Sequence, residues 1–243
     1  MSNHLPNGLT LEKPARNLAA LATTSALTDL QKVVLSQWKK AETFKQLAKH
    51  GIRPVDRLLF YGPPGNGKTM AAQWIGEKIE APVYRVRCES IVSAYLGQTA
   101  GNVGEVMAWL EKQPKCVALF DEVEMMFPGR DVNKSSLARE TNSAMGVFWQ
   151  YLDRWNSPTL FVLATNRPQD LDAALMSRID HQLEFGPPTA EQASRVIQYW
   201  AEVLHEYGGG EWGKVLDDGR QWESFRALFH EVQCHVRQFV CRG

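Results

Sequence analysis

The sequence predicts an α/β fold, in which a parallel sheet carries helices on both faces and is followed by a small all-α domain. Short apolar runs alternate with helical stretches over residues 58–185, as expected for strands that are buried on both faces. After Gly186-Pro187-Pro188 only helical periodicity remains. We therefore expect an arm over residues 1–27, an α/β domain over 28–188 and a helical domain over 189–243.

The first helix is expected to begin at a cap, Thr28 or Asp29, and to run to about His50. Apolar residues recur on one face of this stretch at helical spacing. Gly51 and Pro54 follow and end it, because glycine is favoured just after a helix and proline cannot continue one.

Five short runs rich in apolar and β-branched residues predict the strands. They are Leu58–Tyr61, Val83–Arg87, Val117–Phe120, Leu160–Ala164 and Gln182–Phe185. Helices are expected between them at Lys68–Ile79, after Gly101 and from about Ser135 to Trp155. Such alternation is typical of parallel strands joined by covering helices.

The C-terminal segment shows the spacing of two helices. Thr189 and Gln192 are placed as a capping box, which predicts the start of the first. An apolar stripe follows over residues 193–207, glycines at 208–210 break it, and a second stripe runs over 222–239.

The composition is that of a globular protein: of 243 residues, 44% are hydrophobic and 22% are charged. Lys plus Arg and Asp plus Glu both number 27, and this zero net charge argues against non-specific coating of nucleic acid. The 4 cysteines form no Cys-x-x-Cys pair and are expected to be reduced. No signal peptide or membrane-spanning run is recognised, so the expected location is the cytoplasm.

A phosphate-binding motif follows the first predicted strand of the sheet. The motif G-x-x-x-x-G-K-[ST] is formed by Gly62, Pro63, Pro64, Gly65, Asn66, Gly67, Lys68 and Thr69. Its glycines let backbone N–H groups converge on phosphate oxygens, and the following helix directs its N-terminus at the same anion. Lys68 is expected to reach the β- and γ-phosphates of ATP and Thr69 to ligate Mg²⁺, with Met70 beside them. A glycine-rich turn with an incidental lysine is the alternative, which the flanking strand and helix disfavour.

Two acids, Asp121 and Glu122, end the apolar strand Val117–Phe120. The carboxyl ends of parallel strands are where α/β sheets build their sites. Asp121 is expected to hold Mg²⁺, and Glu122 to act as general base toward the attacking water. A solvated acidic turn is the alternative, and the phosphate-binding motif upstream favours the functional interpretation.

Together with these motifs, Leu163-Ala164-Thr165-Asn166-Arg167-Pro168 and residues 171–180 resemble the AAA+ ATPases, and within them the AAA group of FtsH, katanin and spastin. The resemblance covers roughly residues 28–243 and implies a P-loop ATPase domain with a helical lid. It implies that Asn166 orients the water and that Arg178 is an arginine finger for the neighbouring subunit's nucleotide. In isolation, a turn residue and a surface ion pair would be the simpler explanations.

The resemblance also implies a ring, expected to be a hexamer, because an arginine that acts in trans leaves the site of a monomer incomplete. Family members often carry a second arginine close to the finger, whereas Met176 and Ser177 precede Arg178 here. Arg154 or Arg130 would have to substitute for it, and this departure bears on the rate of hydrolysis.

Tyr95, Leu96 and Gly97 look like the first pore loop of this group, in which an aromatic and a hydrophobic residue grip an extended polypeptide. Tyrosine offers a broad amphipathic contact that does not depend on the substrate's sequence. A role for Tyr95 in the core or at a subunit interface is the alternative. Residues 129–139 lie where a second pore loop would be, with a weaker signal.

The expected function is an ATP-driven ring motor that remodels or unfolds a protein, with ATP and Mg²⁺ as cofactors and a separately encoded protease or adaptor as partner. The alternatives are a motor or loader on nucleic acid and a nucleotide-gated scaffold. The loop Tyr95–Gly97 and the neutral charge favour a protein substrate. An inactive scaffold is disfavoured because the predicted ATPase residues are all present: Lys68, Asp121, Glu122, Asn166 and Arg178. The segment His230–His235 resembles a zinc-protease motif but lacks a histidine four residues after His230.

Overall fold

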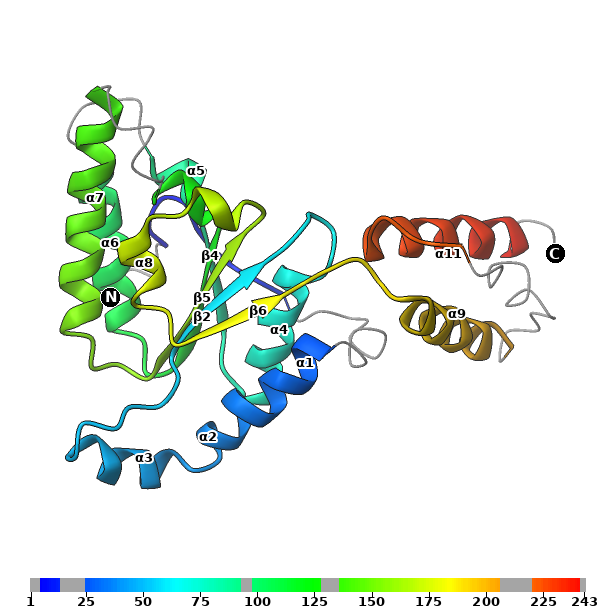
Figure 1. Cartoon of the computed structure of the whole chain (residues 1–243), viewed down its shortest axis with the longest axis horizontal. Helices are drawn as coiled ribbons and strands as arrows, with labels where there is room; N and C mark the ends of the chain where they lie inside the picture. The colour runs from blue at the N-terminus through cyan, green and yellow to red at the C-terminus, as the bar shows by residue number, and fades with distance from the viewer. Residues whose placement is uncertain (1–4, 14–24, 93–97, 128–135, 206–219, 241–243) are drawn as a thin grey trace.

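The computed structural model describes residues 5–13, 25–92, 98–127, 136–205 and 220–240 (Figure 1). A six-stranded sheet in the order β1-β3-β4-β5-β2-β6 lies at its centre. The strands are β1 Leu9–Leu11, β2 Arg57–Tyr61, β3 Val83–Arg87, β4 Cys116–Asp121, β5 Thr159–Thr165 and β6 His181–Glu184. Strands β2 to β6 pair in parallel. The predicted parallel sheet and its strands are confirmed, with ends that differ by at most one residue.

The edge strand β1 is not predicted by the sequence pattern, which assigns its residues to an arm. It runs antiparallel to β3, with Leu9 opposite Val86 and Leu11 opposite Tyr84. Leu9 is buried in the core beneath the sheet. The first described segment is therefore part of the α/β architecture.

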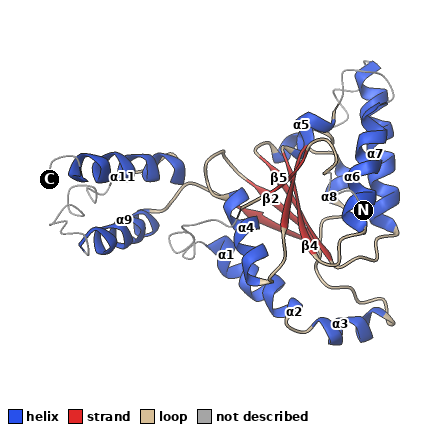
Figure 2. Ribbon diagram, turned by 180° about the vertical axis from the view of Figure 1, so that it is seen from behind, coloured by secondary structure: helices blue, strands red, loops and turns tan. Residues whose placement is uncertain are grey.

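Helical segments connect and follow the strands. They are α1 Ser25–Leu30, η1 Gln31–Leu35, α2 Ser36–Trp38, α3 Ala41–Ala48, α4 Lys68–Lys78, α5 Cys88–Ile91, α6 Gln98–Glu111, η2 Val123–Met125, α7 Ser136–Asp153, η4 Pro168–Asp170, α8 Ala173–Met176, α9 Ala190–His205 and α11 Phe225–Val240. Figure 2 shows α1 and α4 on one side of the sheet and α6 and α7 on the other. In β4, Val117 and Leu119 pack toward α1 and α4, and Ala118 and Phe120 toward α6 and α7. Burial on both faces explains why the strands are uninterrupted apolar runs.

The predicted first helix is wrong in its start and in its continuity. Thr28 and Asp29 are not caps but lie inside α1, because the buried Leu27 and Leu30 extend the apolar face toward the N-terminus. The chain then passes through the π-helical turn η1 and through α2. At Lys40 the backbone leaves helical geometry, with φ −112° and ψ 30°, so α3 is a separate helix.

The two C-terminal helices, α9 and α11, are confirmed and project from the sheet beyond β6 (Figure 1). They pack together through Ala193, Val196, Ile197, Phe225, Leu228 and Val232. The capping box before α9 is also confirmed: the Thr189 N–H donates to Gln192 Oε1 at 3.0 Å, and the Gln192 N–H to Thr189 Oγ1 at 3.2 Å. Across the described residues, every helix is too short or too polar to cross a bilayer.

Candidate nucleotide-binding site

The loop between β2 and α4 has a backbone shape that requires glycine. Gly62, Gly65 and Gly67 have φ of +133°, +84° and +92°, a region that side chains disfavour. A Cβ on Gly62 would lie 2.4 Å from the Phe185 carbonyl oxygen. The loop leads directly into the N-terminus of α4, where backbone N–H groups attract anions. The predicted strand, loop and helix context of the motif is therefore present.

Lys68, at the first position of α4, is buried with an exposed fraction of 8%. Its Nζ donates to the Gly62 carbonyl at 2.6 Å, to the Pro63 carbonyl at 3.0 Å and to Asn166 Oδ1 at 2.8 Å. Burial lowers the pKa of Lys68, while the negative charges of Asp121 and Glu124 oppose that shift. The fold thus brings together Lys68 and Asn166, which lie far apart in the sequence and which the motifs predicted to share one site.

Thr69 and Asp121 line the same pocket, Thr69 from the first turn of α4 and Asp121 from the end of β4. A hydroxyl and a carboxylate are the oxygen ligands that Mg²⁺ prefers, usually with nucleotide phosphates and water completing its shell. The donor set therefore fits Mg²⁺ held jointly by the protein and a nucleotide.

Glu122 follows Asp121 in a left-handed conformation, with φ 57° and ψ 48°. This conformation is uncommon for a residue with a side chain and is concentrated at functional sites. Desolvation and the neighbouring Asp121 carboxylate raise the pKa of Glu122, and Glu89 and Glu124 add to the rise. A carboxylate with a raised pKa at the pocket wall is suited to accept a proton.

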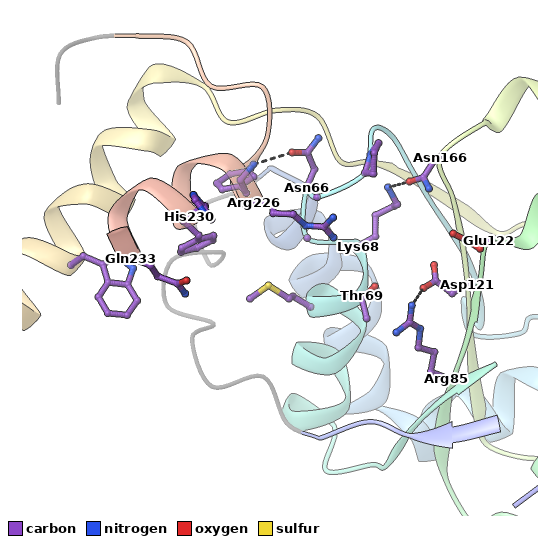
Figure 3. A pocket seen from close by; sticks show the side chains of 17 residues that line it. Asn66, Lys68, Thr69, Arg85, Asp121, Glu122, Asn166, Arg226, His230 and Gln233 are labelled. Atoms are coloured by element: carbon purple, nitrogen blue, oxygen red, sulfur yellow. Dashed lines mark hydrogen bonds and ion pairs between the residues drawn. The ribbon is translucent and has the colours of Figure 1, made fainter. Parts of the chain in front are cut away.

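The opposite wall of the pocket comes from α9 and α11, and the cavity between the walls is about 600 Å³. Its lining from these helices is Trp200, Phe225, Arg226, Phe229, His230 and Gln233. Two hydrogen bonds join the walls: the Phe225 N–H donates to Asn66 Oδ1 at 3.1 Å, and the Arg226 N–H to the Gly65 carbonyl at 3.0 Å. Met70 also lines the cavity, and the planar ring of a nucleobase would fit among these side chains (Figure 3).

The sequence did not single out Arg226, which faces the loop from α11 (Figure 3). Arg226 lines the same cavity as Lys68, and its positive charge adds to the lowering of the pKa of Lys68, which burial mainly causes. The signal that was available was a basic residue in the second C-terminal stripe, immediately after Phe225. The apolar periodicity of that stripe predicts packing alone.

Arg178 lies outside this pocket, between α8 and β6. Its guanidinium stacks 4.7 Å from the centre of the Trp149 ring, and its Nε is 3.8 Å from Asp153 Oδ1. Its Nη1 donates to the Ala174 carbonyl at 3.1 Å. The structure therefore does not bring Arg178 to the nucleotide pocket of its own chain.

Other predicted residues are placed elsewhere or not described. Tyr95, Leu96, Gly97 and Arg130 lie outside the described residues. Arg154 stacks on Tyr151, with its guanidinium carbon 4.4 Å from the ring centre.

The sheet order, the glycine loop and the buried lysine define an α/β protein of the P-loop class, with a helical wall over its phosphate loop. The family described as "ATPase family associated with various cellular activities (AAA)" matches residues 58–187, and the chain belongs to this family. The predicted membership of the AAA+ ATPases is therefore confirmed.

Individual relatives support the same assignment. The chain is 30% identical over 188 residues to an uncharacterized AAA family ATPase, y4kL, of Sinorhizobium fredii, covering 76% of this chain and 54% of that protein. It is 33% identical over 190 residues to the 26S proteasome regulatory subunit 7 homolog of Schizosaccharomyces pombe, covering 76% and 41%. The chain thus spans about half the length of these relatives. The crystal structure of the FIGL-1 AAA domain in complex with ADP shares the fold, with a TM-score of 0.62, 21% identity and coverage of 80% and 63%.

Proposed function

We propose that this chain hydrolyses ATP and uses the energy to remodel or unfold a protein substrate as a subunit of a ring. The observation that carries the proposal is the convergence of Lys68, Asn166, Asp121 and Glu122 on one pocket. Similarity to 26S proteasome regulatory subunits supports the choice of a protein substrate. A separately encoded protease or adaptor and a hexameric ring remain parts of this proposal.

Each residue of the pocket has a role in the proposed reaction. The backbone of Gly62–Thr69 binds the phosphates, and Lys68 stabilises charge on the phosphate oxygens. Thr69 and Asp121 would hold Mg²⁺, which when bound neutralises phosphate charge. Glu122 accepts the proton of the attacking water, and Asn166 orients that water.

Met70 and the aromatic residues of α9 and α11 hold the nucleoside, so the helical wall closes the site against water. The two hydrogen bonds described above, which join described residues of the two walls, end on the phosphate loop at Gly65 and Asn66. A movement of α11 therefore reaches the loop directly. This link is how hydrolysis in the pocket would be converted into motion of the helical pair.

Arg178 acts on the nucleotide of a neighbouring copy, because its own contacts hold it away from the pocket of its chain. A guanidinium suits this role because its planar fork matches phosphoryl oxygens. A head-to-tail contact of this kind closes into a ring when the rotation between copies permits it. Tyr95, Leu96 and Gly97 would line the channel of the ring and grip the substrate.

The experiment uses Glu122→Gln, which keeps the size of the side chain but removes the base. This variant is expected to bind ATP, hydrolyse it slowly and hold the assembled state. We would purify it from the source cells with ATP, beside a Glu122→Gln/Tyr95→Ala variant. A protein captured only when Tyr95 is intact supports the proposal. Captured nucleic acid, or a partner indifferent to Tyr95, contradicts it.

A further inference from the structure

Arg85, in the middle of β3, lies between two carboxylates that the sequence motifs do not connect. Its Nη2 forms an ion pair with Asp121 Oδ2, the predicted Mg²⁺ ligand (Figure 3). Its Nη1 lies 3.7 Å from Glu12 Oε1, one residue beyond β1. In the described part of the chain, these are the acids within ion-pair distance of Arg85.

Strand pairing explains why these three side chains meet. Thr10 is opposite Arg85, and the Glu12 N–H donates to the Val83 carbonyl at 2.8 Å, so the pairing of β1 continues to Glu12. Side chains two residues apart on a strand share a face, which places Glu12 on the face of Arg85. On the other side Arg85 is opposite Leu119, two residues before Asp121.

Glu12 is also fixed to the helix that begins at the phosphate loop. Gln73, one turn after Thr69 on α4, donates from Nε2 to Glu12 Oε2 at 2.9 Å. The two oxygens of Glu12 therefore face different partners, one on α4 and one on β3. The exposed fractions of the Glu12, Arg85 and Asp121 side chains are 19%, 34% and 17%, so solvent screens these charges only in part.

We propose that Glu12 and Arg85 are positioning residues for the magnesium–nucleotide site. Arg85 orients the Asp121 carboxylate, and Glu12 holds Arg85 and balances its charge, so that Asp121 is free to ligate Mg²⁺. Arginine and Mg²⁺ are both cations that need the same carboxylate. With Glu12 present, Arg85 keeps an anionic partner when Asp121 turns to Mg²⁺; without it, Arg85 retains Asp121 and repels the ion. This inference rests on the proposed function, because it assumes that ATP and Mg²⁺ bind here.

The test is the Mg²⁺ dependence of nucleotide binding, measured with fluorescently labelled ADP across a Mg²⁺ titration and in EDTA. Glu12→Gln removes the charge but keeps an oxygen that accepts from Gln73. We expect the Mg²⁺ concentration for half-maximal binding to rise about fivefold, as the loss of one partly screened charge predicts, while affinity in EDTA is unchanged. Glu77→Gln, an exposed change on the same α4, is the matched control and is expected to leave both values unchanged.

The coupling to Arg85 is tested in a double-mutant cycle. Arg85→Met removes the charge of this side chain, whereas Arg85→Lys keeps it, and thermal melting establishes that each variant is folded. We expect Glu12→Gln to have no further effect when it is combined with Arg85→Met, and its full effect when it is combined with Arg85→Lys. If Arg85→Met does not fold, Arg85→Gln takes its place as the uncharged variant.

Three results would overturn the inference. The first is an unchanged Mg²⁺ dependence of nucleotide binding in Glu12→Gln, and the second is the same rise in the required Mg²⁺ concentration when Arg85→Met is also present. The third is an equal loss of nucleotide affinity with Mg²⁺ and with EDTA, which would mark a merely structural role for Glu12. Failure of the unaltered chain to bind nucleotide at any Mg²⁺ concentration would overturn the proposed function as well. The two failures are thereby distinguished.

Discussion

Lys68 and Arg178 are both cations predicted to act on phosphate, and the structure places them in contrasting surroundings. Lys68 is buried in the pocket and donates to three oxygens of its own chain. Arg178 has a side chain that is 33% exposed and packs on Trp149, outside that pocket. One chain therefore carries the groups expected to bind a nucleotide in one pocket, whereas the predicted finger lies outside the pocket of its own chain.

The largest expected effect is on ATP hydrolysis when Arg178 is replaced. Arg178→Ala is expected to leave the Kd for ATP within about twofold and to lower kcat about 10³-fold, the size of effect that arginine fingers have. Binding by calorimetry and steady-state phosphate release give the two values. Arg195→Ala, which removes an exposed arginine on α9, is the control. Unchanged turnover in Arg178→Ala would mean that another residue is the finger.

The next effect concerns Lys68. Lys68→Ala removes the cation and leaves the oxygens around it without their donor, so nucleotide affinity is expected to fall about 100-fold or more. Calorimetric titration with ATP measures the loss. Lys78→Ala, at the other end of the same helix, is expected to bind as the unaltered chain does. Retained affinity in Lys68→Ala contradicts the assignment of the phosphate loop.

A third prediction concerns Gly62, in the phosphate loop, and leaves Arg178 and its contacts unaltered. Gly62→Ala places a Cβ 2.4 Å from the Phe185 carbonyl oxygen at a positive φ. We expect a loss of about 2 kcal/mol in the free energy of unfolding, measured in urea. Gly186→Ala is the matched control, because a Cβ there meets nothing within 4 Å. Equal stabilities for the two variants would show that the loop adapts.

The smallest effect concerns Asp56, whose carboxyl lies near Asp180, the residue that joins the Arg178 segment to β2. Asp180 Oδ2 accepts from the N–H groups of Asp56 and Arg57 at 3.0 and 2.9 Å. Burial raises the pKa of Asp56 from 3.8 to about 6, against the attraction of Arg57, and Asp180 adds to the rise. Because the folded chain binds the proton of the Asp56 carboxyl more tightly than the unfolded chain does, protonation of Asp56 stabilises the fold. That stabilisation is complete below pH 3.8 and is lost as pH rises through about 6.

Asp56→Asn mimics the protonated form at every pH. We expect it to be more stable than the unaltered chain at pH 8 by up to about 1 kcal/mol, with the difference shrinking toward pH 5. Urea unfolding at the two pH values measures it, with the exposed Asp29→Asn as control. A difference that does not change with pH would contradict the raised pKa of Asp56.

The parts that the sequence predicts well are those that local patterns specify. The buried strands and the loop Gly62–Thr69 depend on residues that are neighbours in the chain. Lys68, Asp121 and Asn166 could be expected in one place because each follows, or ends, a strand of one parallel sheet.

The parts that were missed depend on tertiary contacts. β1 is three residues long, and only its pairing with β3 makes it a strand. Threonine is a residue type that often caps helices, yet Thr28 lies inside α1. The burial of Leu27 and Leu30 extends the helix beyond Thr28 toward the N-terminus. Arg85 and Arg226 have no motif around them, and only the folded chain shows what they face.

The most direct test of the central claim is complementation between two inactive variants. The Lys68→Ala chain is expected to bind nucleotide poorly but retains Arg178. The Arg178→Ala chain has an intact pocket but lacks the predicted finger. If the finger acts in trans, a mixture of the two is expected to hydrolyse ATP well above the sum of their separate rates. A mixture that stays at that sum, although the two chains assemble together, would contradict the account.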